Sequence, residues 1–162
     1  MSIVVVTGMG PRTGTSFVMQ RAIATGLPVA GTKFPIYTIP EHNPDGYWEG
    51  IGLKHSMLDN HIAKLWYNDL SKIDHGLISN VVVLERKDKL AQMHSIYKVF
   101  KDECKLWPSL AKQFTPSDII YHQNKQLNHW LDQRDQNSVM RVYTEELNDS
   151  IEAILQFLER GL

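Results

Sequence analysis

The sequence predicts an α/β domain of three layers, α/β/α, with a small and mostly parallel sheet, and two features carry this prediction. Runs of β-branched or apolar residues at 3–7, 80–85 and 138–144 are typical of buried strands. Between these runs, apolar residues recur at the spacing of amphipathic helices. Strands separated by helices pair in parallel through right-handed crossovers, so helices are expected on both faces of the sheet.

Two helices and a short strand are expected between the first two runs. The first helix covers 14–25 and stops at Gly26, a residue typical of helix ends. A short strand is expected over 27–30, and residues 31–50, which are rich in Pro and Gly, predict irregular structure. Helical spacing then resumes and predicts a second helix through Leu58, Ile62, Leu65 and Trp66.

Three further helices are expected in the second half of the chain. Thr115-Pro-Ser-Asp118 starts one of them, because Thr suits the N-cap and Pro suits the first helical position. The helix before it has an apolar stripe at Leu90, Met93, Ile96, Tyr97 and Phe100. The closing helix has its apolar side at Leu147, Ile151, Ile154, Leu155 and Leu158.

Length and composition indicate one domain, over residues 1–162, of ordinary globular character. The formal net charge is −1, so no global basic field predicts a nucleic-acid partner or an anionic membrane surface, and any anion site must be local. The sequence has no apolar run of about 18 residues, so we expect no membrane span. The lone Cys104 and the absence of a signal-peptide pattern favour a cytoplasmic protein.

The stretch VVVTGMGPRTGTSF, residues 4–17, runs from a strand through a glycine-rich turn into a helix. A phosphate-binding loop is built in this way, so the stretch predicts a P-loop NTPase-like fold with its ligand at the carboxyl ends of the strands. Two positions depart from the pattern G-x-x-x-x-G-K-S/T. Met9 stands at the first glycine and Thr15 stands at the lysine.

Other donors in this stretch can replace the missing lysine. Backbone N–H groups from Thr13 to Phe17 lie at the positive end of the expected helix, and the hydroxyls of Thr13, Thr15 and Ser16 add to them. Arg12 supplies a fixed positive charge in a planar fork that suits oxyanions. A glycine turn that merely joins strand to helix is the alternative interpretation.

Three segments resemble sulfotransferases. Gly-Pro-Arg-Thr-Gly-Thr-Ser, at 10–16, is similar to the family's 5′-phosphosulfate loop, in which Lys or Arg and a small residue precede Gly-Thr-Ser or Gly-Thr-Thr. Segment 84–97 resembles the 3′-phosphate segment, most closely in the bacterial trehalose sulfotransferase type. Segment 142–147 resembles the strand-to-helix close Tyr-Glu-Asp-Leu. The chain is shorter than typical members, and the glycine-rich segment near the C-terminus of cytosolic members has no counterpart here.

The resemblance implies transfer of a sulfuryl group from 3′-phosphoadenosine 5′-phosphosulfate (PAPS) to a hydroxyl or amine of a small-molecule or glycan acceptor. It implies that Arg86 and Ser95 bind the 3′-phosphate. Arg12 is also expected to act in catalysis, because a guanidinium there would stabilise the departing bridge oxygen without a metal. The residues expected to bind the 5′ end are Arg12, Thr13, Gly14, Thr15 and Ser16.

The acceptor side of such a reaction needs a general base, and Glu49 is the predicted one. It ends the stretch HNPDGYWE, residues 42–49, in the irregular region where binding residues concentrate. Glu41 and His42 are weaker candidates. The alternative is a plain turn at 43–46 whose following aromatic residues pack on the core.

Two other functions stay open. A small P-loop kinase would need Mg²⁺ held by a loop hydroxyl and a strand-end carboxylate, and Glu85 is ambiguous in that role. A non-catalytic nucleotide or sulfate binder would keep the fold without the base. No metal is expected, because the histidines lack the i, i+4 pair of a helical zinc site. A homo-oligomer is also kept open, since a second subunit could complete the acceptor pocket of so short a chain.

Overall fold

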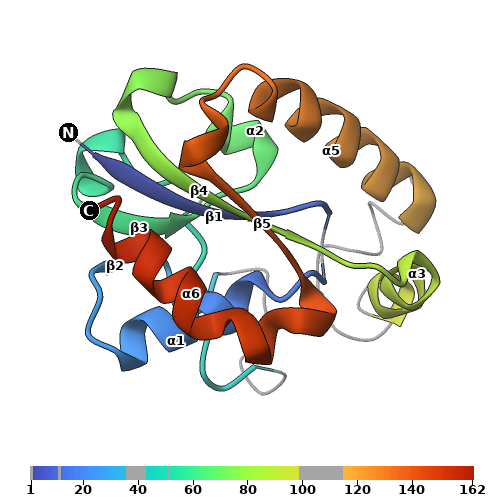
Figure 1. Ribbon diagram of the computed structural model, residues 1–162. Coiled ribbons are helices and arrows are strands. Elements are labelled where there is room, and N and C mark those ends of the chain that lie inside the picture. Colours follow the sequence, from blue (N-terminus) through green and yellow to red (C-terminus); the bar gives the residue numbers. More distant parts are fainter. Residues whose placement is uncertain (1, 11, 36–42, 51, 99–114) are drawn as a thin grey trace.

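The computed structural model describes residues 2–10, 12–35, 43–50, 52–98 and 115–162, and it has three layers (Figure 1). Within these residues a five-stranded sheet has the order β2-β3-β1-β4-β5, and every neighbouring pair of strands is parallel. The predicted α/β/α architecture is therefore confirmed. The strands are β1 (Ile3–Gly8), β2 (Val29–Ala30), β3 (His61–Lys64), β4 (Ile78–Glu85) and β5 (Val139–Tyr143).

Helices follow the strands along the chain, as parallel pairing requires. The α-helices are α1 (Thr15–Ala24), α2 (Tyr67–Leu70), α3 (Lys89–Lys98), α5 (Pro116–Leu131) and α6 (Leu147–Glu159). Short 3₁₀ turns cover His55–Met57, His75–Leu77, Gln136–Ser138 and Thr144–Glu146. No helix within the described ranges is long and apolar enough to cross a bilayer.

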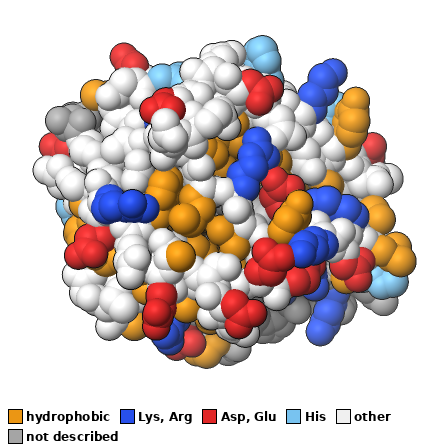
Figure 2. Space-filling view, viewed as in Figure 1, with side chains coloured by type: hydrophobic (Ala, Val, Ile, Leu, Met, Phe, Trp, Pro, Cys, Tyr) orange, Lys and Arg blue, Asp and Glu red, His pale blue; other side chains and the backbone are white. Residues whose placement is uncertain are grey.

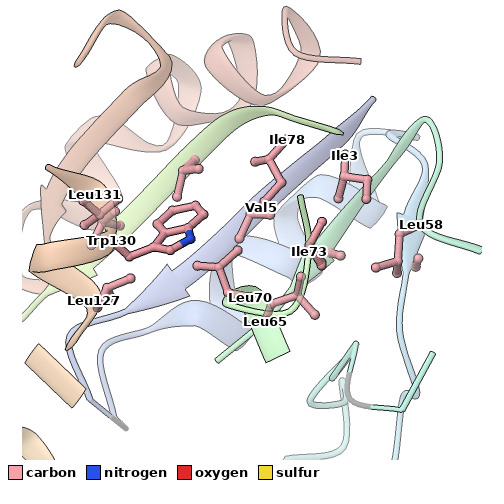
Figure 3. Close-up of a cluster of buried hydrophobic side chains, with 14 of the residues drawn as sticks. Ile3, Val5, Leu58, Leu65, Leu70, Ile73, Ile78, Leu127, Trp130 and Leu131 are labelled. Carbon is pink, nitrogen blue, oxygen red and sulfur yellow. The ribbon is translucent and has the colours of Figure 1, made fainter. Parts of the chain in front are cut away.

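The central strand β1 is buried on both faces, which explains its unbroken β-branched run. On one face Val4 and Val6 pack under α1 and α6. On the other face Ile3 and Val5 belong to a buried cluster that also contains Trp130 of α5 (Figure 3). The loop between β1 and α1 follows the carboxyl end of β1, and the neighbouring strands are parallel, so the loop lies at the carboxyl edge of the sheet, where ligands bind in this class of fold.

The helix predicted around residues 58–66 is wrong, because this stretch forms strand β3. Ile62 and Ala63 are both fully buried, one on each face of the sheet, next to β1. Leu58 and Leu65 lie just outside the strand, and their spacing from Ile62 imitates a helical stripe. The strand also ends in Lys64, and a charged residue at that position does not indicate a buried strand in a sequence.

The other predicted elements in the described ranges are confirmed, with small differences at their ends. The start of α5 has a complete capping box: Asp118 N–H donates to Thr115 Oγ1 at 3.2 Å, and Thr115 N–H donates to Asp118 Oδ2 at 2.9 Å. Helix α3 is described as far as Lys98, and of its predicted apolar stripe Ile96 is buried whereas Leu90 and Tyr97 are exposed. Phe100 and Cys104 lie outside the described residues.

Candidate functional site

The loop between β1 and α1, residues 9–14, is the core of the candidate site. It is tightly wound: Arg12 and Gly14 have φ values of 65° and 89°. A Cβ added at Gly8, where the loop begins, would lie 2.1 Å from Thr13 Oγ1, so only glycine fits there. A left-handed arginine is uncommon and costs of the order of 1–2 kcal/mol, and such strain tends to collect at ligand sites.

The first turn of α1 is open to an anion. Gly14 is its N-cap and has no side chain to cap the helix, and the turn contains no acidic residue. The N–H groups of the turn therefore keep their capacity to bind an anion at the positive end of the helix dipole. Thr13, in contrast, is fully buried, and its hydroxyl donates to the Gly10 carbonyl at 3.3 Å, which fixes the turn.

Two residues predicted for the site meet across the chain. Arg12 Nε donates to Ser95 Oγ at 2.9 Å, which joins the β1–α1 loop to helix α3. The Arg12 side chain is exposed, so its guanidinium faces the solvent side of the loop. The cation predicted to replace the P-loop lysine is thus present at the loop, fixed by a residue from the segment predicted to bind the 3′-phosphate.

A second cation reaches the loop from β3, and the sequence analysis missed it. Lys64 is 3% exposed, and its Nζ donates to Ser16 Oγ at 2.9 Å. The same ammonium lies 2.7 Å from Glu49 Oε1 and donates to the Tyr47 carbonyl at 3.2 Å. These three acceptors match the three donors of an ammonium group. The signal that could have identified this residue is a lysine that follows Ile62 and Ala63 directly, at the end of a buried strand.

Backbone pairing places Glu49 beside Lys64. Strand β2 stops after Ala30, and Glu49 takes the next position along β3, with a parallel bridge to Lys64. Glu49 exchanges two backbone hydrogen bonds with Thr32, at 2.8 and 3.1 Å. Its carboxylate is nearly fully buried, and Oε2 accepts from Trp66 Nε1 at 3.0 Å. Both oxygens of the predicted base therefore already have a donor.

The turn before Glu49 is anchored to α1. Gln20 Nε2 donates to Asn43 Oδ1 at 3.0 Å and to the Gly46 carbonyl at 2.8 Å. The turn predicted at 43–46 is present, with Gly46 N–H donating to the Asn43 carbonyl at 2.9 Å. Trp48 packs against the α1 and α6 side of the core, as the alternative interpretation expected. Glu41 and His42 lie outside the described residues.

Burial sets the charge state of Lys64. Desolvation lowers the pKa of its ammonium below the ordinary value, the nearby charge and hydrogen bond of Glu49 oppose this, and the charge of Arg12 lowers the pKa slightly further. The carboxylate of Glu49 thus helps to keep a buried lysine protonated beside the loop.

Arg86 and Ser95, which the sequence predicts to share one phosphate, have different partners in the structure: Ser95 accepts from Arg12, and Arg86 faces a carboxylate. Arg86 lies at the end of β4 and forms a long ion pair with Glu145, with 3.9 Å between Nε and Oε1. The same carboxylate accepts the N–H groups of Lys87 and Asp88 at 3.1 and 3.3 Å. Desolvation works against its ionisation, yet these hydrogen bonds and the charge of Arg86 hold the pKa of Glu145 below its ordinary value.

Charged side chains therefore neutralise one another where β4 and β5 end, and Figure 2 shows acidic and basic side chains mixed in that region. Glu85, the strand-end carboxylate, pairs with Arg141 at 2.9 Å. Lys87 pairs with Glu146. Among the described residues, no group of three or more His, Cys, Asp or Glu side chains gathers as a metal site would.

The sheet order, the parallel strands and the glycine loop between β1 and α1 define a P-loop-like α/β fold of the sulfotransferase type. A crystal structure of mouse sulfotransferase SULT7A1 complexed with PAP is similar to this chain, with a TM-score of 0.52 and 15% sequence identity. The match covers 97% of this chain and 58% of that one, so this chain spans less than two thirds of the sulfotransferase's length. The predicted resemblance is confirmed at the level of the fold. No protein-family model and no curated protein matches the sequence.

Proposed function

We propose that the chain is a sulfotransferase that moves a sulfuryl group from PAPS to a hydroxyl or amine acceptor. The observation that carries this proposal is that two cations from different elements lie where a P-loop would have its lysine: Arg12 in the β1–α1 loop, and Lys64 at the first turn of α1. The likeness in fold to a sulfotransferase complexed with PAP supports it. We take PAP to be the product nucleotide, 3′-phosphoadenosine 5′-phosphate.

The donor set at the loop suits the chemistry of sulfuryl transfer. As the sulfur leaves the nucleotide, negative charge builds up on the bridge oxygen and the 5′-phosphate. Fixed N–H groups and cations stabilise such charge without a metal ion. In this proposal Arg12 and the first turn of α1 face that charge, and the residues that bind the 5′ end are Arg12, Thr13, Gly14, Thr15 and Ser16, joined by Lys64.

The 3′-phosphate site remains a proposal that rests on Arg86 and Ser95. Arg86 already lies beside a carboxylate, and Glu145 accepts two backbone N–H groups of the same segment. A phosphate could take the place of that carboxylate, because it presents the same kind of acceptor oxygens to the same donors. Ser95 would contribute a neutral donor, next to Arg12.

Glu49 is the proposed general base. A single residue, Lys64, links it to the first turn of α1, because Lys64 contacts both Glu49 and Ser16. The acceptor would be a small molecule or a glycan, and a second subunit could supply part of its pocket. A cytoplasmic location likewise stays a prediction.

Incubation with PAPS carrying a labelled sulfuryl group, together with panels of hydroxyl and amine acceptors, tests the proposed activity. We expect label on at least one acceptor class, release of PAP in equal amount, and no loss of activity in EDTA. Labelled inorganic sulfate alone, formed at the rate seen without protein, would contradict the proposal. An alanine substitution of the exposed Arg21 is a suitable control for changes at Arg12, since it removes the same charge at a position on α1 outside the loop.

A further inference from the structure

We propose that Lys64 exchanges partners during the reaction: it pairs with Glu49 while that carboxylate is ionised, and it binds the anion in the β1–α1 loop once Glu49 carries a proton. This inference rests on the proposed function and deepens it. It assigns Lys64 and Glu49 a linked role, so that binding of the product nucleotide at the loop is accompanied by proton uptake at Glu49.

The position of the ammonium group makes the exchange short. Lys64 Nζ lies between Glu49 Oε1, at 2.7 Å, and Ser16 Oγ, at 2.9 Å. Ser16 belongs to the first turn of α1, whose N–H groups form the anion site. The ammonium is therefore already in contact with the first turn of α1 and needs to replace only one of its three acceptors.

The two oxygens of Glu49 differ in a way that fixes where the proton goes. Oε2 accepts from the indole N–H of Trp66 at 3.0 Å, and an indole N–H can only donate. Oε1 faces the ammonium of Lys64, which is carried on a flexible four-carbon stem. A proton on Oε1 removes the negative charge that holds Lys64 there, so departure of Lys64 and protonation of Glu49 favour one another.

Charge explains why the change favours the product state. The ionised pair is almost fully buried and has no net charge, so it attracts the nucleotide weakly. Protonation of Glu49 leaves one uncompensated positive charge beside the loop, where the 5′-phosphate forms. The charged groups that bear on Lys64 among the described residues are Glu49, from the segment after β2, and Arg12, from the loop. Both the burial of Lys64 and the charge of Arg12 favour a new anionic partner.

The acceptor hydroxyl gives its proton to Glu49 Oε1 as its oxygen forms a bond to sulfur. The bond between sulfur and the bridge oxygen breaks, and its electron pair stays on the 5′-phosphate of PAP. Lys64 remains an ammonium throughout and moves from the carboxylate to that phosphate. No oxidant, reductant or metal takes part.

Proton counting by calorimetry tests the inference on the wild-type protein, without any turnover. PAP is titrated into the protein at three pH values on both sides of neutrality, about 6.5, about 7.25 and about 8.0. Each titration is done in two buffers of different ionisation enthalpy, so that the number of protons taken up can be calculated. We expect net proton uptake on binding, up to about one proton per nucleotide, that increases as the pH falls. Binding without uptake at any pH would overturn the inference.

Variants separate the uptake at Glu49 from titration of the nucleotide itself. Glu49→Gln imitates the protonated carboxyl, so it should abolish the excess uptake and bind PAP roughly 5- to 10-fold more tightly than wild type. The double variant Lys64→Met/Glu49→Gln should also lack the uptake, but bind PAP roughly 10- to 100-fold more weakly than Glu49→Gln alone, since a charge-assisted hydrogen bond is lost. Glu152→Gln, an exposed change of equal charge on α6, should leave both quantities unchanged.

Other outcomes distinguish this inference from the proposed function. Tight metal-free binding of PAP with equal affinity for wild type and Glu49→Gln would leave the sulfotransferase proposal intact and overturn the partner exchange. If Glu49→Gln does not fold, an infrared difference spectrum of the wild type gives the answer: PAP should produce the carbonyl band of a protonated buried carboxyl, and its absence would contradict the exchange. If neither PAP nor inorganic pyrophosphate binds, both proposals fall.

Discussion

Arg12 Nε donates to Ser95 Oγ at 2.9 Å, although 83 positions separate the two residues in the chain. The contact joins the two segments that the sequence assigns to opposite ends of one nucleotide. It also fixes the guanidinium of a residue whose backbone lies in the left-handed region. Arg12 is therefore held in place before any ligand binds, which is the condition for strong electrostatic stabilisation of a transition state.

Arg12→Ala should lower the rate of sulfuryl transfer more than it weakens nucleotide binding. Removal of one preorganised donor from a site of developing charge costs roughly 100- to 1000-fold in rate. Folding should survive because the side chain is exposed. Steady-state turnover of PAPS and titration of PAP measure the two effects, with Arg21→Ala as the control. Near-normal turnover of the Arg12→Ala variant would show that Arg12 is not a catalytic residue.

Arg86→Ala should weaken PAP binding roughly 10- to 100-fold, because a charge-assisted hydrogen bond contributes about 1.5–3 kcal/mol. The loss should nearly vanish for adenosine 5′-phosphosulfate, which lacks the 3′-phosphate. Ser95→Ala should cost less, about 1 kcal/mol, since its donor is neutral. Titration of both nucleotides against both variants measures this. An equal loss for the two nucleotides in Arg86→Ala would show that Arg86 does not bind the 3′-phosphate.

Glu145→Gln should strengthen PAP binding, because Glu145 competes with the 3′-phosphate for Arg86 and for the N–H groups of Lys87 and Asp88. We expect a gain of roughly threefold to tenfold at low ionic strength, which falls as salt screens the charges. Adenosine 5′-phosphosulfate should show little gain. Calorimetry with Glu152→Gln as control checks this prediction, and an unchanged PAP affinity would place the 3′-phosphate elsewhere.

Loss of one partner from the buried pair of Lys64 and Glu49 should be costly for stability. Lys64→Met leaves a buried carboxylate without its cation, and we expect the free energy of unfolding to fall by about 3–5 kcal/mol. The double variant Lys64→Met/Glu49→Leu should recover most of this loss, because an apolar pair of similar volume is often neutral. Urea denaturation measures both. If the loss of stability in the double variant equals the sum of the losses in Lys64→Met and Glu49→Leu measured separately, the pair is not coupled.

The same experiment across pH tests the charge of Lys64. Burial lowers the pKa of the folded lysine below that of the unfolded one, so between the two values the unfolded state binds more protons. The free energy of unfolding should therefore rise with pH through that window. Lys64→Met should flatten the rise, whereas Lys72→Met, at an exposed lysine on the surface, should not.

The periodicity of the sequence predicted most of the fold because most elements follow simple rules. β1 and β4 contain the apolar runs 3–6 and 81–84, and α5 begins with the residues that its capping box requires. Strand β3 escaped prediction because it is only four residues long, and because its last residue, Lys64, is a buried charge. The apolar pattern of a sequence does not show that Lys64 will be buried, because its partner Glu49 lies in a different segment, after β2.

The candidate site was predictable only where its residues are local. Glycines, hydroxyls and Arg12 fall within one short stretch, and their spacing predicts an anion loop. The contact of Lys64 with Glu49 depends on where β2 stops and on the backbone bonds between Glu49 and Thr32, which no local pattern contains. The ion pair of Arg86 likewise depends on a carboxylate from a segment some sixty positions away, Glu145.

A thermal-shift comparison of PAP in EDTA with ATP plus Mg²⁺ tests the central claim, that the β1–α1 loop binds a sulfuryl-donor nucleotide without metal. A ligand that binds only the native state raises the melting temperature by mass action. PAP at about 100 times its Kd should stabilise the protein by about 2.7 kcal/mol, a shift of a few degrees for a chain of this size. ATP plus Mg²⁺ should have a much smaller effect. Stabilisation by ATP plus Mg²⁺ with no response to PAP would contradict the claim and favour a kinase.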